Sequence, residues 1–127
     1  MIYLLDTHTF LWYFEDSDNL SETAVNIIED ADSLKYVSMA SLWEFSIKYS
    51  IKKLRFEGGL SNLLDIILQN GFIILPITPL YLDSMIELPF IHRDPFDRLL
   101  IATAKAEGLT ILTADENIHK YDVPSVW

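Results

Sequence analysis

Two kinds of hydrophobic pattern alternate along this chain. The first is a short apolar run, often β-branched or aromatic and bounded by polar residues, which is typical of a buried strand. Strands are expected at Ile2 to Leu5, Tyr36 to Ser38, Phe72 to Leu75 and Thr110 to Thr113, with a candidate fifth at Val123 to Val126. These runs are too short to be helices, and too uniformly apolar for a sheet with one face in water.

The second pattern places apolar residues at helical spacing in the segments between the strands. Helices are expected over Thr7 to Phe14, Ser21 to Ile28, Met39 to Lys53, Leu60 to Asn70, Pro79 to Leu88 and Phe96 to Glu107. Ser38 is a suitable N-cap, and Gly71 and Gly108 are suitable helix stops. Strands that alternate with helices predict an α/β fold of three layers, with a mostly parallel sheet of four to five strands.

Composition narrows the class of protein. The chain has 127 residues, half of them hydrophobic, which predicts one compact domain over residues 1–127. There is no cysteine, so disulfides and thiolate metal sites are excluded. The apolar runs are too short for a signal peptide or a membrane span, and we expect a cytoplasmic protein.

The charge argues against a simple nucleic-acid binder. With 19 acidic and 9 basic residues the net charge is −10, whereas proteins that grip phosphate backbones are normally basic. Acidity alone also keeps a protein soluble. Any nucleic-acid site must therefore depend on local charge or on a bound cation.

Four acidic residues follow or flank the predicted strands. Asp6 comes directly after the first strand, and Asp115 comes shortly after the fourth. Glu44 lies in the second turn of the helix after the second strand, and Asp97 in the first turn of the helix before the fourth. In open parallel sheets the ligand site lies outside the carboxyl ends of the strands, where the strand order reverses. We therefore expect these four acids to share one rim.

A cluster of carboxylates favours a metal site. Like charges raise one another's pKa, and a cation relieves that repulsion. Hard oxygen ligands favour Mg²⁺ or Mn²⁺ over zinc. Such an ion lowers the pKa of bound water and orients a phosphate, so a nucleophilic side chain is unnecessary.

The same residues also have structural interpretations. Asp94 before Pro95 is typical of an N-cap, with Asp97 as a partner of the helix dipole. Asp6 and Asp115 are also suited to cap or turn positions. The three histidines, His8, His92 and His119, show no metal-ligand spacing. Trp12 and Trp43 are expected in the core rather than as platforms for RNA bases.

Four motifs resemble those of PIN domains, and the resemblance covers essentially the whole chain. They are Leu4 to His8, Ser41 to Phe45, His92 to Ala102 and Leu112 to Asp115. The string His-Arg-Asp-Pro-Phe-Asp-Arg in the third motif is similar to the VapC-like toxin branch. Members of that branch are ribonucleases that are each paired with an antitoxin.

The resemblance implies an endoribonuclease that uses Mg²⁺ or Mn²⁺ and leaves a 5′-phosphate. It implies that Asp6 and Asp97 are direct metal ligands and that Glu44 and Asp115 complete the catalytic site. Supporting roles are implied for Thr7, Thr113 and Asp94. It also implies a cognate antitoxin protein and a homodimer.

Basic residues near the acids weaken the argument that the net negative charge excludes nucleic-acid binding. Arg93 and Arg98 flank Asp97 in the sequence and are candidates for contacts with RNA phosphates. A second basic group ends the long helix, where the helix dipole also favours cations. Its members are Lys48, Lys52, Lys53 and Arg55.

Three other classes of protein deserve comparison. A phospho-accepting receiver domain requires an acidic pair after the first strand and a lysine after the last, and neither is present. A phosphatase of the haloacid dehalogenase type requires a second aspartate two residues after Asp6, where this chain has His8. A catalytically silent interaction module with the same fold stays open, although all four carboxylates are intact.

Overall fold

The computed structural model describes all of residues 1–127 and contains one five-stranded sheet. The strands are β1 (Ile2–Leu5), β2 (Leu34–Ser38), β3 (Ile73–Leu75), β4 (Thr110–Leu112) and β5 (Ser125–Val126). All neighbouring strands are parallel, and their order is β3-β2-β1-β4-β5. The predicted α/β class with a mostly parallel sheet is thus confirmed.

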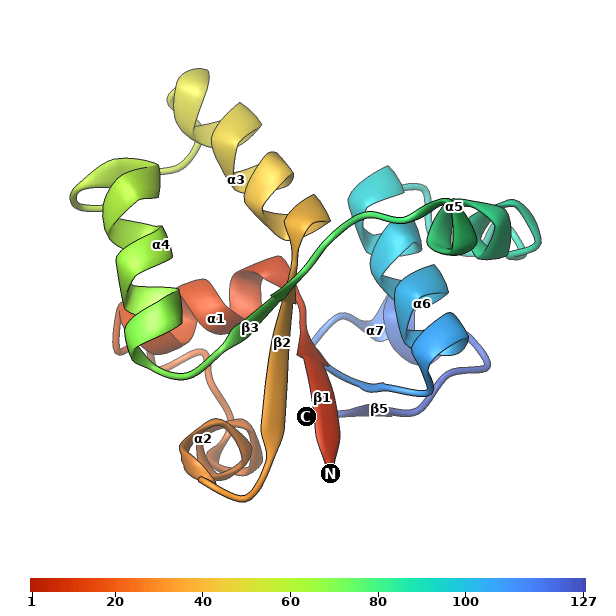
Figure 1. Cartoon of the computed structure of the whole chain (residues 1–127), viewed down its shortest axis with the longest axis horizontal. Helices are drawn as coiled ribbons and strands as arrows, with labels where there is room; N and C mark the ends of the chain where they lie inside the picture. The colour runs from red at the N-terminus through yellow and green to blue at the C-terminus, as the bar shows by residue number, and fades with distance from the viewer.

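Seven helices connect the strands. They are α1 (Thr7–Phe14), α2 (Glu22–Glu29), α3 (Met39–Ser50), α4 (Gly59–Gln69), α5 (Pro79–Ile86), α6 (Pro95–Glu107) and α7 (Glu116–His119). Helices α1 to α4 lie on one side of the sheet and α5 to α7 on the other, which gives three layers (Figure 1). Helix α7 has only four residues, too few for a hydrophobic period to reveal it in the sequence.

Helix α3 is shorter than predicted. It ends at Ser50 rather than Lys53, because Lys52 adopts a left-handed conformation with φ of 62°. The amide of Lys53 then donates to the carbonyl of Lys48 at 2.9 Å, closing the helix end. Such ends are usually marked by glycine, so a lysine at this position gave no signal in the sequence.

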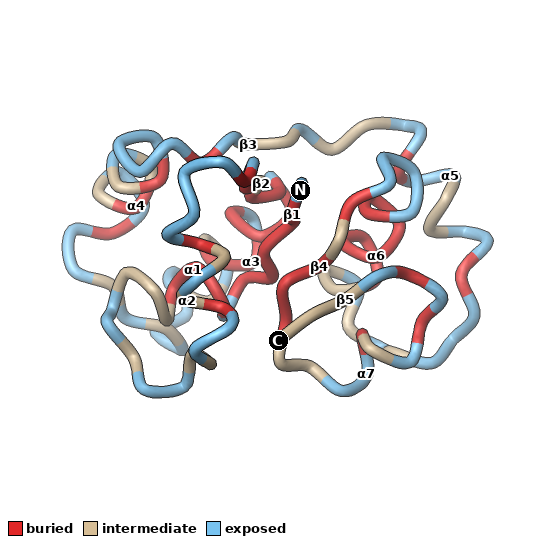
Figure 2. Tube along the Cα trace, turned by 90° about the horizontal axis from the view of Figure 1, so that it is seen from below, coloured by how far each residue is buried: buried red, intermediate tan, exposed pale blue.

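The sheet separates the two large clusters of the core, and a third, small cluster consists of Ala40, Tyr81 and Leu99. Tyr3 and Leu5 of β1 face the cluster that α1 to α4 cover, whereas Leu4 faces the cluster beneath α6. In β4, Leu112 faces the cluster under α1 to α4, and Ile111 faces the cluster beneath α6. Figure 2 shows that the buried part of the chain follows the central strands β1, β2 and β4 and parts of the surrounding helices. The continuous apolar runs in the sequence reflect this burial on both faces.

The strand order reverses at β1. The chain passes from β1 to β2 on one side, and β4 later pairs with the other side of β1. Asp6 directly follows β1, and its amide donates to the carbonyl of Leu112 at 3.2 Å. The first and fourth strands are therefore neighbours, and both end at the same rim. None of the helices has the length and apolar character needed to cross a membrane.

Candidate active site

Asp6 is buried, and both its carboxylate oxygens are occupied. Oδ1 caps helix α1 by accepting from the amide of Thr9 at 2.8 Å and from its hydroxyl at 2.5 Å. Oδ2 accepts a very short hydrogen bond from the hydroxyl of Thr113. Burial raises the pKa of Asp6, although these hydrogen bonds oppose the shift. The side chain is therefore both an N-cap and a fixed acidic group at the rim.

Glu44 projects from α3 and has only 3% of its surface exposed. Its Oε1 accepts from the hydroxyl of Thr7 at 2.6 Å. Its Oε2 pairs with Nζ of Lys48 at 2.7 Å, one helical turn further along. The hydrogen bond with Glu44 raises the pKa of Lys48. The ammonium group therefore lies at the edge of the acidic cluster and stays charged.

Asp94 and Asp97 begin helix α6. Oδ1 of Asp94 accepts from the amides of Phe96 at 2.8 Å and Asp97 at 3.3 Å, so Asp94 is the N-cap. Burial raises the pKa of Asp97 to about 7, and the charges of Asp94, Asp6 and Glu44 add to the shift. Burial alone would raise the pKa, but the added effect of three acids requires that they lie near Asp97. The structure thus brings Asp6, Glu44 and Asp97 into one electrostatic neighbourhood.

Asp115 joins this cluster through His92. It caps α7 by accepting from the amide of Asn117 at 2.8 Å, and its Oδ2 lies 2.9 Å from Nε2 of His92. The same imidazole nitrogen lies 3.0 Å from Oδ2 of Asp97. Partial burial disfavours the charged form of Asp115, but the hydrogen bonds from His92 and Asn117 prevail and lower its pKa. One histidine therefore connects two of the four acids.

His92 lies among the acids, although the three histidines show no metal-ligand spacing along the sequence. Its nitrogen belongs to the only group of three side chains with metal-ligand spacing, together with Asp97 and Asp115. The residues come from a loop, a helix and a turn, so linear spacing could not reveal them. The sequence signal that was available was the position of His92 two residues before the capping Asp94.

Two further partners of the acids were not singled out as site residues. Thr9 reaches Asp6 because an N-cap side chain bonds three residues ahead. Lys48 pairs with Glu44 because residues four apart meet on one helix face. Both spacings were readable from the sequence. What the sequence lacked was evidence that these local pairs border a buried acidic cluster.

Arg98 differs from its predicted role as a phosphate contact. Its guanidinium is buried and donates to the carbonyls of Pro89 at 2.9 Å, Met85 at 3.3 Å and Leu88 at 3.4 Å. It also lies 4.2 Å from the ring centre of Phe90. These contacts use the guanidinium to fix the segment between α5 and α6. Arg93 is exposed beside the cluster and keeps the predicted role as a proposal.

Trp43 also differs from its expected place in the core. Its side chain is 55% exposed and meets the ring of Phe96 edge-on, with ring centres 5.1 Å apart. Both aromatic residues directly precede an acid of the cluster, Glu44 and Asp97 respectively. Trp12 is half-buried against Trp127. An exposed indole beside the rim is thus available to a ligand.

The residues present fit a hard divalent cation. The cluster offers carboxylate oxygens from four segments, and such oxygens are the ligands that Mg²⁺ and Mn²⁺ prefer. Burial is the main cause of the raised pKa of Asp97, and the neighbouring acids Asp94, Asp6 and Glu44 add to it, which is the repulsion that a bound cation would relieve. In addition, the buried hydroxyl of Ser41, one turn before Glu44 on α3, has no hydrogen-bond partner. A polar group left unpaired beside a site is typical of a place where water or a ligand binds.

Known proteins resemble this chain along nearly its whole length. The PIN domain family matches residues 3–124. Ribonuclease VapC22 of Mycobacterium tuberculosis is 29% identical over 134 residues, covering 98% of this chain and 97% of the relative.

Solved structures share the fold. The VapBC2 structure from Rickettsia felis, bound to a DNA fragment from its promoter, matches with a TM-score of 0.74 and 18% identity, covering 100% of this chain and 99% of that chain. Mycobacterium tuberculosis VapC20, described as a sarcin–ricin loop cleaving toxin, matches with a TM-score of 0.73 and 14% identity. That match covers 98% of both chains.

Proposed function

This chain belongs to the PIN-domain family, and on that premise we propose that it is a metal-dependent endoribonuclease, the toxin of a toxin–antitoxin pair. The observation that carries the proposal is the meeting of Asp6, Glu44, Asp97 and Asp115 at the rim where the strand order reverses. The relatives named above as ribonuclease and toxin support the choice of substrate. The family match gives no support to a receiver-type signalling domain.

In this proposal Asp6 and Asp97 hold Mg²⁺ or Mn²⁺, and Glu44 and Asp115 complete the acidic site. When bound, the ion supplies positive charge at the scissile phosphate and lowers the pKa of water. No cysteine is present to act as a nucleophile. Hydrolysis consumes one water molecule: a bond forms between its oxygen and phosphorus, and the bond from phosphorus to the 3′ oxygen breaks. The products carry a 5′-phosphate and a 3′-hydroxyl.

The hydroxyl groups around the acids hold them in place. Thr113 and Thr9 fix the two oxygens of Asp6, and Thr7 fixes one oxygen of Glu44. All three threonines are buried, so water does not compete for these bonds. Rigid carboxylates keep a metal site in its productive geometry, and misplacement by about 1 Å costs about 100-fold in rate.

The substrate is expected to approach along the exposed side of the cluster. Lys48 is partly exposed there and pairs with Glu44, and Arg93 is exposed next to Asp94. These cations offset the local negative charge and are suited to bind phosphate groups. The exposed indole of Trp43 offers a surface on which an unpaired base can stack. Single-stranded or looped RNA suits this combination.

Digestion of RNA with and without Mn²⁺ tests the proposed activity. We expect the wild-type protein to cleave only in the presence of the ion, and Asp6→Asn to cleave at least 100-fold more slowly, as is common when a metal ligand is lost. The matched control is Asp122→Asn, which changes an exposed acid outside the cluster. A folded wild-type protein that binds Mn²⁺ but leaves RNA intact would instead be the silent interaction module.

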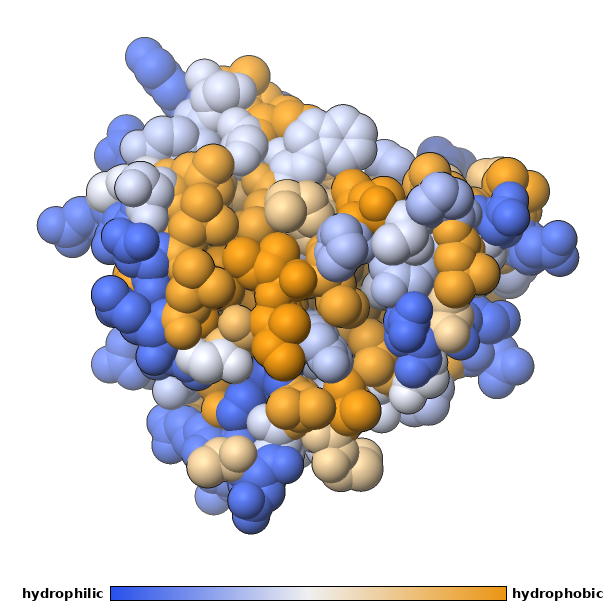
Figure 3. Space-filling view, in the orientation of Figure 1, coloured by the Kyte–Doolittle hydropathy of each residue, from blue (hydrophilic) through white to orange (hydrophobic).

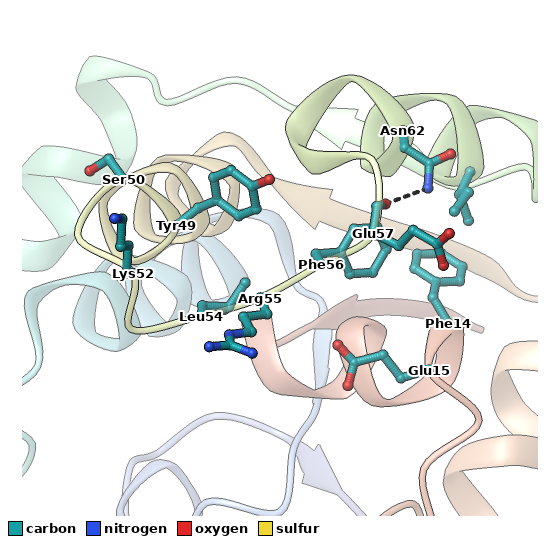
Figure 4. A pocket seen from close by; sticks show the side chains of 11 residues that line it. Phe14, Glu15, Tyr49, Ser50, Lys52, Leu54, Arg55, Phe56, Glu57 and Asn62 are labelled. Carbon is teal, nitrogen blue, oxygen red and sulfur yellow. Dashed lines mark hydrogen bonds between the residues drawn. The ribbon is translucent and has the colours of Figure 1, made fainter.

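A groove formed by α1, α3 and α4 is the proposed binding site of the antitoxin. It encloses about 950 Å³ at the ends of α1 and α3 and along the start of α4 (Figure 4). Apolar side chains such as Phe56 and Leu54 line it, together with the charged Glu15, Lys52 and Arg55. A groove with both apolar and charged lining suits a short amphipathic segment. The net charge of −10 favours a basic one.

From this groove α3 leads directly to Glu44. We propose that a basic residue of the antitoxin segment reaches the carboxylates and displaces the metal. Inhibition then occupies the site and leaves the toxin folded. Titration with the product of the neighbouring gene should abolish cleavage while leaving the far-UV circular dichroism of the toxin unchanged. Excess partner that binds without affecting cleavage would contradict this mechanism.

A second copy of the chain is the proposed partner of another apolar surface. Figure 3 shows apolar side chains gathered over α4 and the edge strand β3. Exposed members of this surface are Leu60 and Leu68 of α4 and Ile73 of β3. Leu60 and Leu68 are eight residues apart and so lie on one side of α4, which a symmetric partner is able to cover. We expect Leu68→Glu to convert a dimer to monomer in light scattering, and Ile86→Glu, on the far side at α5, to leave it dimeric.

A further inference from the structure

His92 occupies an unusual position between two acids of the proposed site. Its Nε2 lies 2.9 Å from Oδ2 of Asp115 and 3.0 Å from Oδ2 of Asp97. Its side chain is only 12% exposed. An imidazole with this geometry either donates a hydrogen bond to the two carboxylates or binds a metal ion together with them. The other ring nitrogen distinguishes these two cases.

Nδ1 of His92 accepts a hydrogen bond of 3.2 Å from the backbone amide of Asp94. A nitrogen that accepts presents its lone pair, so in the neutral ring the proton resides on Nε2. Coordination of a metal through Nε2 would move the proton to Nδ1, where it would face the Asp94 N–H group. Histidines that bind metals normally donate their second N–H to an acceptor. The acceptor role of Nδ1 therefore indicates that Nε2–H is a donor.

The segment that carries His92 is fixed independently of the acids. The hydroxyl oxygen of Tyr121 accepts from the amides of Ile91 at 3.1 Å and His92 at 2.9 Å, and donates to the carbonyl of Pro89 at 2.8 Å. The guanidinium of Arg98 lies 3.3 Å from the same hydroxyl. The imidazole is thus held in place before any ligand arrives, which is what a fixed donor requires.

We propose that His92 is a positioning residue whose Nε2–H holds Asp97 and Asp115 side by side, and that it is not a metal ligand. The inference deepens the proposed function and rests on it. Two carboxylates that lie close together repel each other, and a donor shared between one oxygen of each lowers that cost. Tyr121 and Arg98 act one step further away, through the backbone that carries the ring.

Two substitutions separate this role from a purely structural one. Glutamine places its amide NH₂ near the position of Nε2, whereas asparagine reaches only the position of Nδ1. Asparagine can therefore still accept from the Asp94 amide but cannot bridge the two acids. We expect His92→Asn to weaken Mn²⁺ binding and to lower kcat by about 10- to 100-fold, the usual effect of losing a partner of a metal ligand. We expect His92→Gln to recover most of both, with KM for RNA similar in all three proteins.

The tautomer is measured directly in the wild-type protein, so the proposal stays testable if a variant does not fold. Nitrogen-15 spectra of the imidazole should show a proton on Nε2, both without metal and with saturating Mg²⁺. A proton on Nδ1 in the Mg²⁺ form would show that Nε2 binds the ion and would overturn the proposal. Equal Mn²⁺ affinity and equal kcat in the Asn and Gln variants would also overturn it.

The same experiments separate this inference from the proposed function. If the wild-type protein binds Mn²⁺, shows the Nε2–H tautomer and loses ion affinity in His92→Asn, then the positioning role holds even if no RNA is cleaved. In that case the nuclease proposal fails alone. Conversely, normal RNA cleavage by His92→Asn would leave the nuclease intact and contradict the positioning role.

Discussion

The hydroxyl of Thr7 donates to Oε1 of Glu44 at 2.6 Å and so joins the start of α1 to the middle of α3. Both side chains are buried, with 3% of each residue exposed. Because the other oxygen of Glu44 is bound by Lys48, neither oxygen of this buried acid lacks a partner. The pair shows one way in which the site is built, because a buried threonine directly after β1 fixes an acid that comes from a different element.

Replacement of Thr7 tests this arrangement. Thr7→Val keeps the shape of the side chain but removes the donor, which leaves one oxygen of a buried carboxylate without its bond. We expect a loss of about 1–3 kcal/mol in the free energy of unfolding and a lower kcat, measured by urea denaturation and RNA cleavage. Thr7→Ser retains the hydroxyl and serves as the control. Equal losses in Val and Ser variants would contradict a role for the hydrogen bond.

Asp97→Asn should separate catalysis from stability. Removal of one charge from a repulsive cluster should raise the melting temperature of the metal-free protein, because the pKa of Asp97 is raised by burial and by its acidic neighbours. RNA cleavage should be lost at the same time. Asp94→Asn is the matched control, since asparagine also caps helices well. Normal cleavage by Asp97→Asn would show that Asp97 only supports the helix.

The stability of the metal-free protein should depend on pH through Asp97. Its pKa is about 7 in the folded state and near the ordinary value of 3.8 when unfolded. Between these values the folded state holds a proton that the unfolded state has released, so stability falls as pH rises through this window and levels off above it. From pH 5 to pH 8, the free energy of unfolding of the wild type should fall by roughly 1–3 kcal/mol relative to that of Asp97→Asn. Urea denaturation of both proteins at both pH values measures this difference. An equal change in the free energy of unfolding of the two proteins would contradict the role of Asp97.

The two arginines of the third motif should behave differently. Arg98→Met removes the buried guanidinium that donates to three carbonyls at the end of α5 and in the segment after it, and we expect a loss of about 2–4 kcal/mol in the free energy of unfolding. Arg93→Met removes an exposed charge, so its stability should change by less than about 0.5 kcal/mol. Its KM for RNA should rise, with a shallower salt dependence of binding. A stable Arg98→Met protein with weakened RNA binding would restore the phosphate contact that the sequence suggested.

The order of elements and the placement of the acids were predictable because they depend on local rules. Apolar runs such as Ile2 to Leu5 identify strands buried on both faces, and Asp6 at the end of such a strand is placed by the geometry of parallel sheets. The capping position of Asp94 follows from Pro95 beside it. In each of these cases the neighbouring residues in the chain supply the physical cause.

The remaining features depend on contacts between distant segments. His92 reaches Asp115 across 23 residues, and Arg98 turns away from the site because carbonyls of the preceding segment surround its guanidinium. The exposure of Trp43 depends on which face of α3 meets the sheet, and apolar residues on both sides of that helix obscure the answer. Periodicity and spacing carry no information about such partners, which appear only when the chain is folded.

The chemical ends of the RNA products test the central claim most directly. Wild-type protein and Asp97→Asn are each incubated with a defined RNA in Mn²⁺ or in EDTA, and the product ends are identified by mass spectrometry. The account predicts 5′-phosphate and 3′-hydroxyl ends that form only with wild type and Mn²⁺, because the attacking oxygen comes from water. Products ending in a 2′,3′-cyclic phosphate, or ends that form equally in EDTA or with Asp97→Asn, would contradict hydrolysis by a metal held at this acidic cluster.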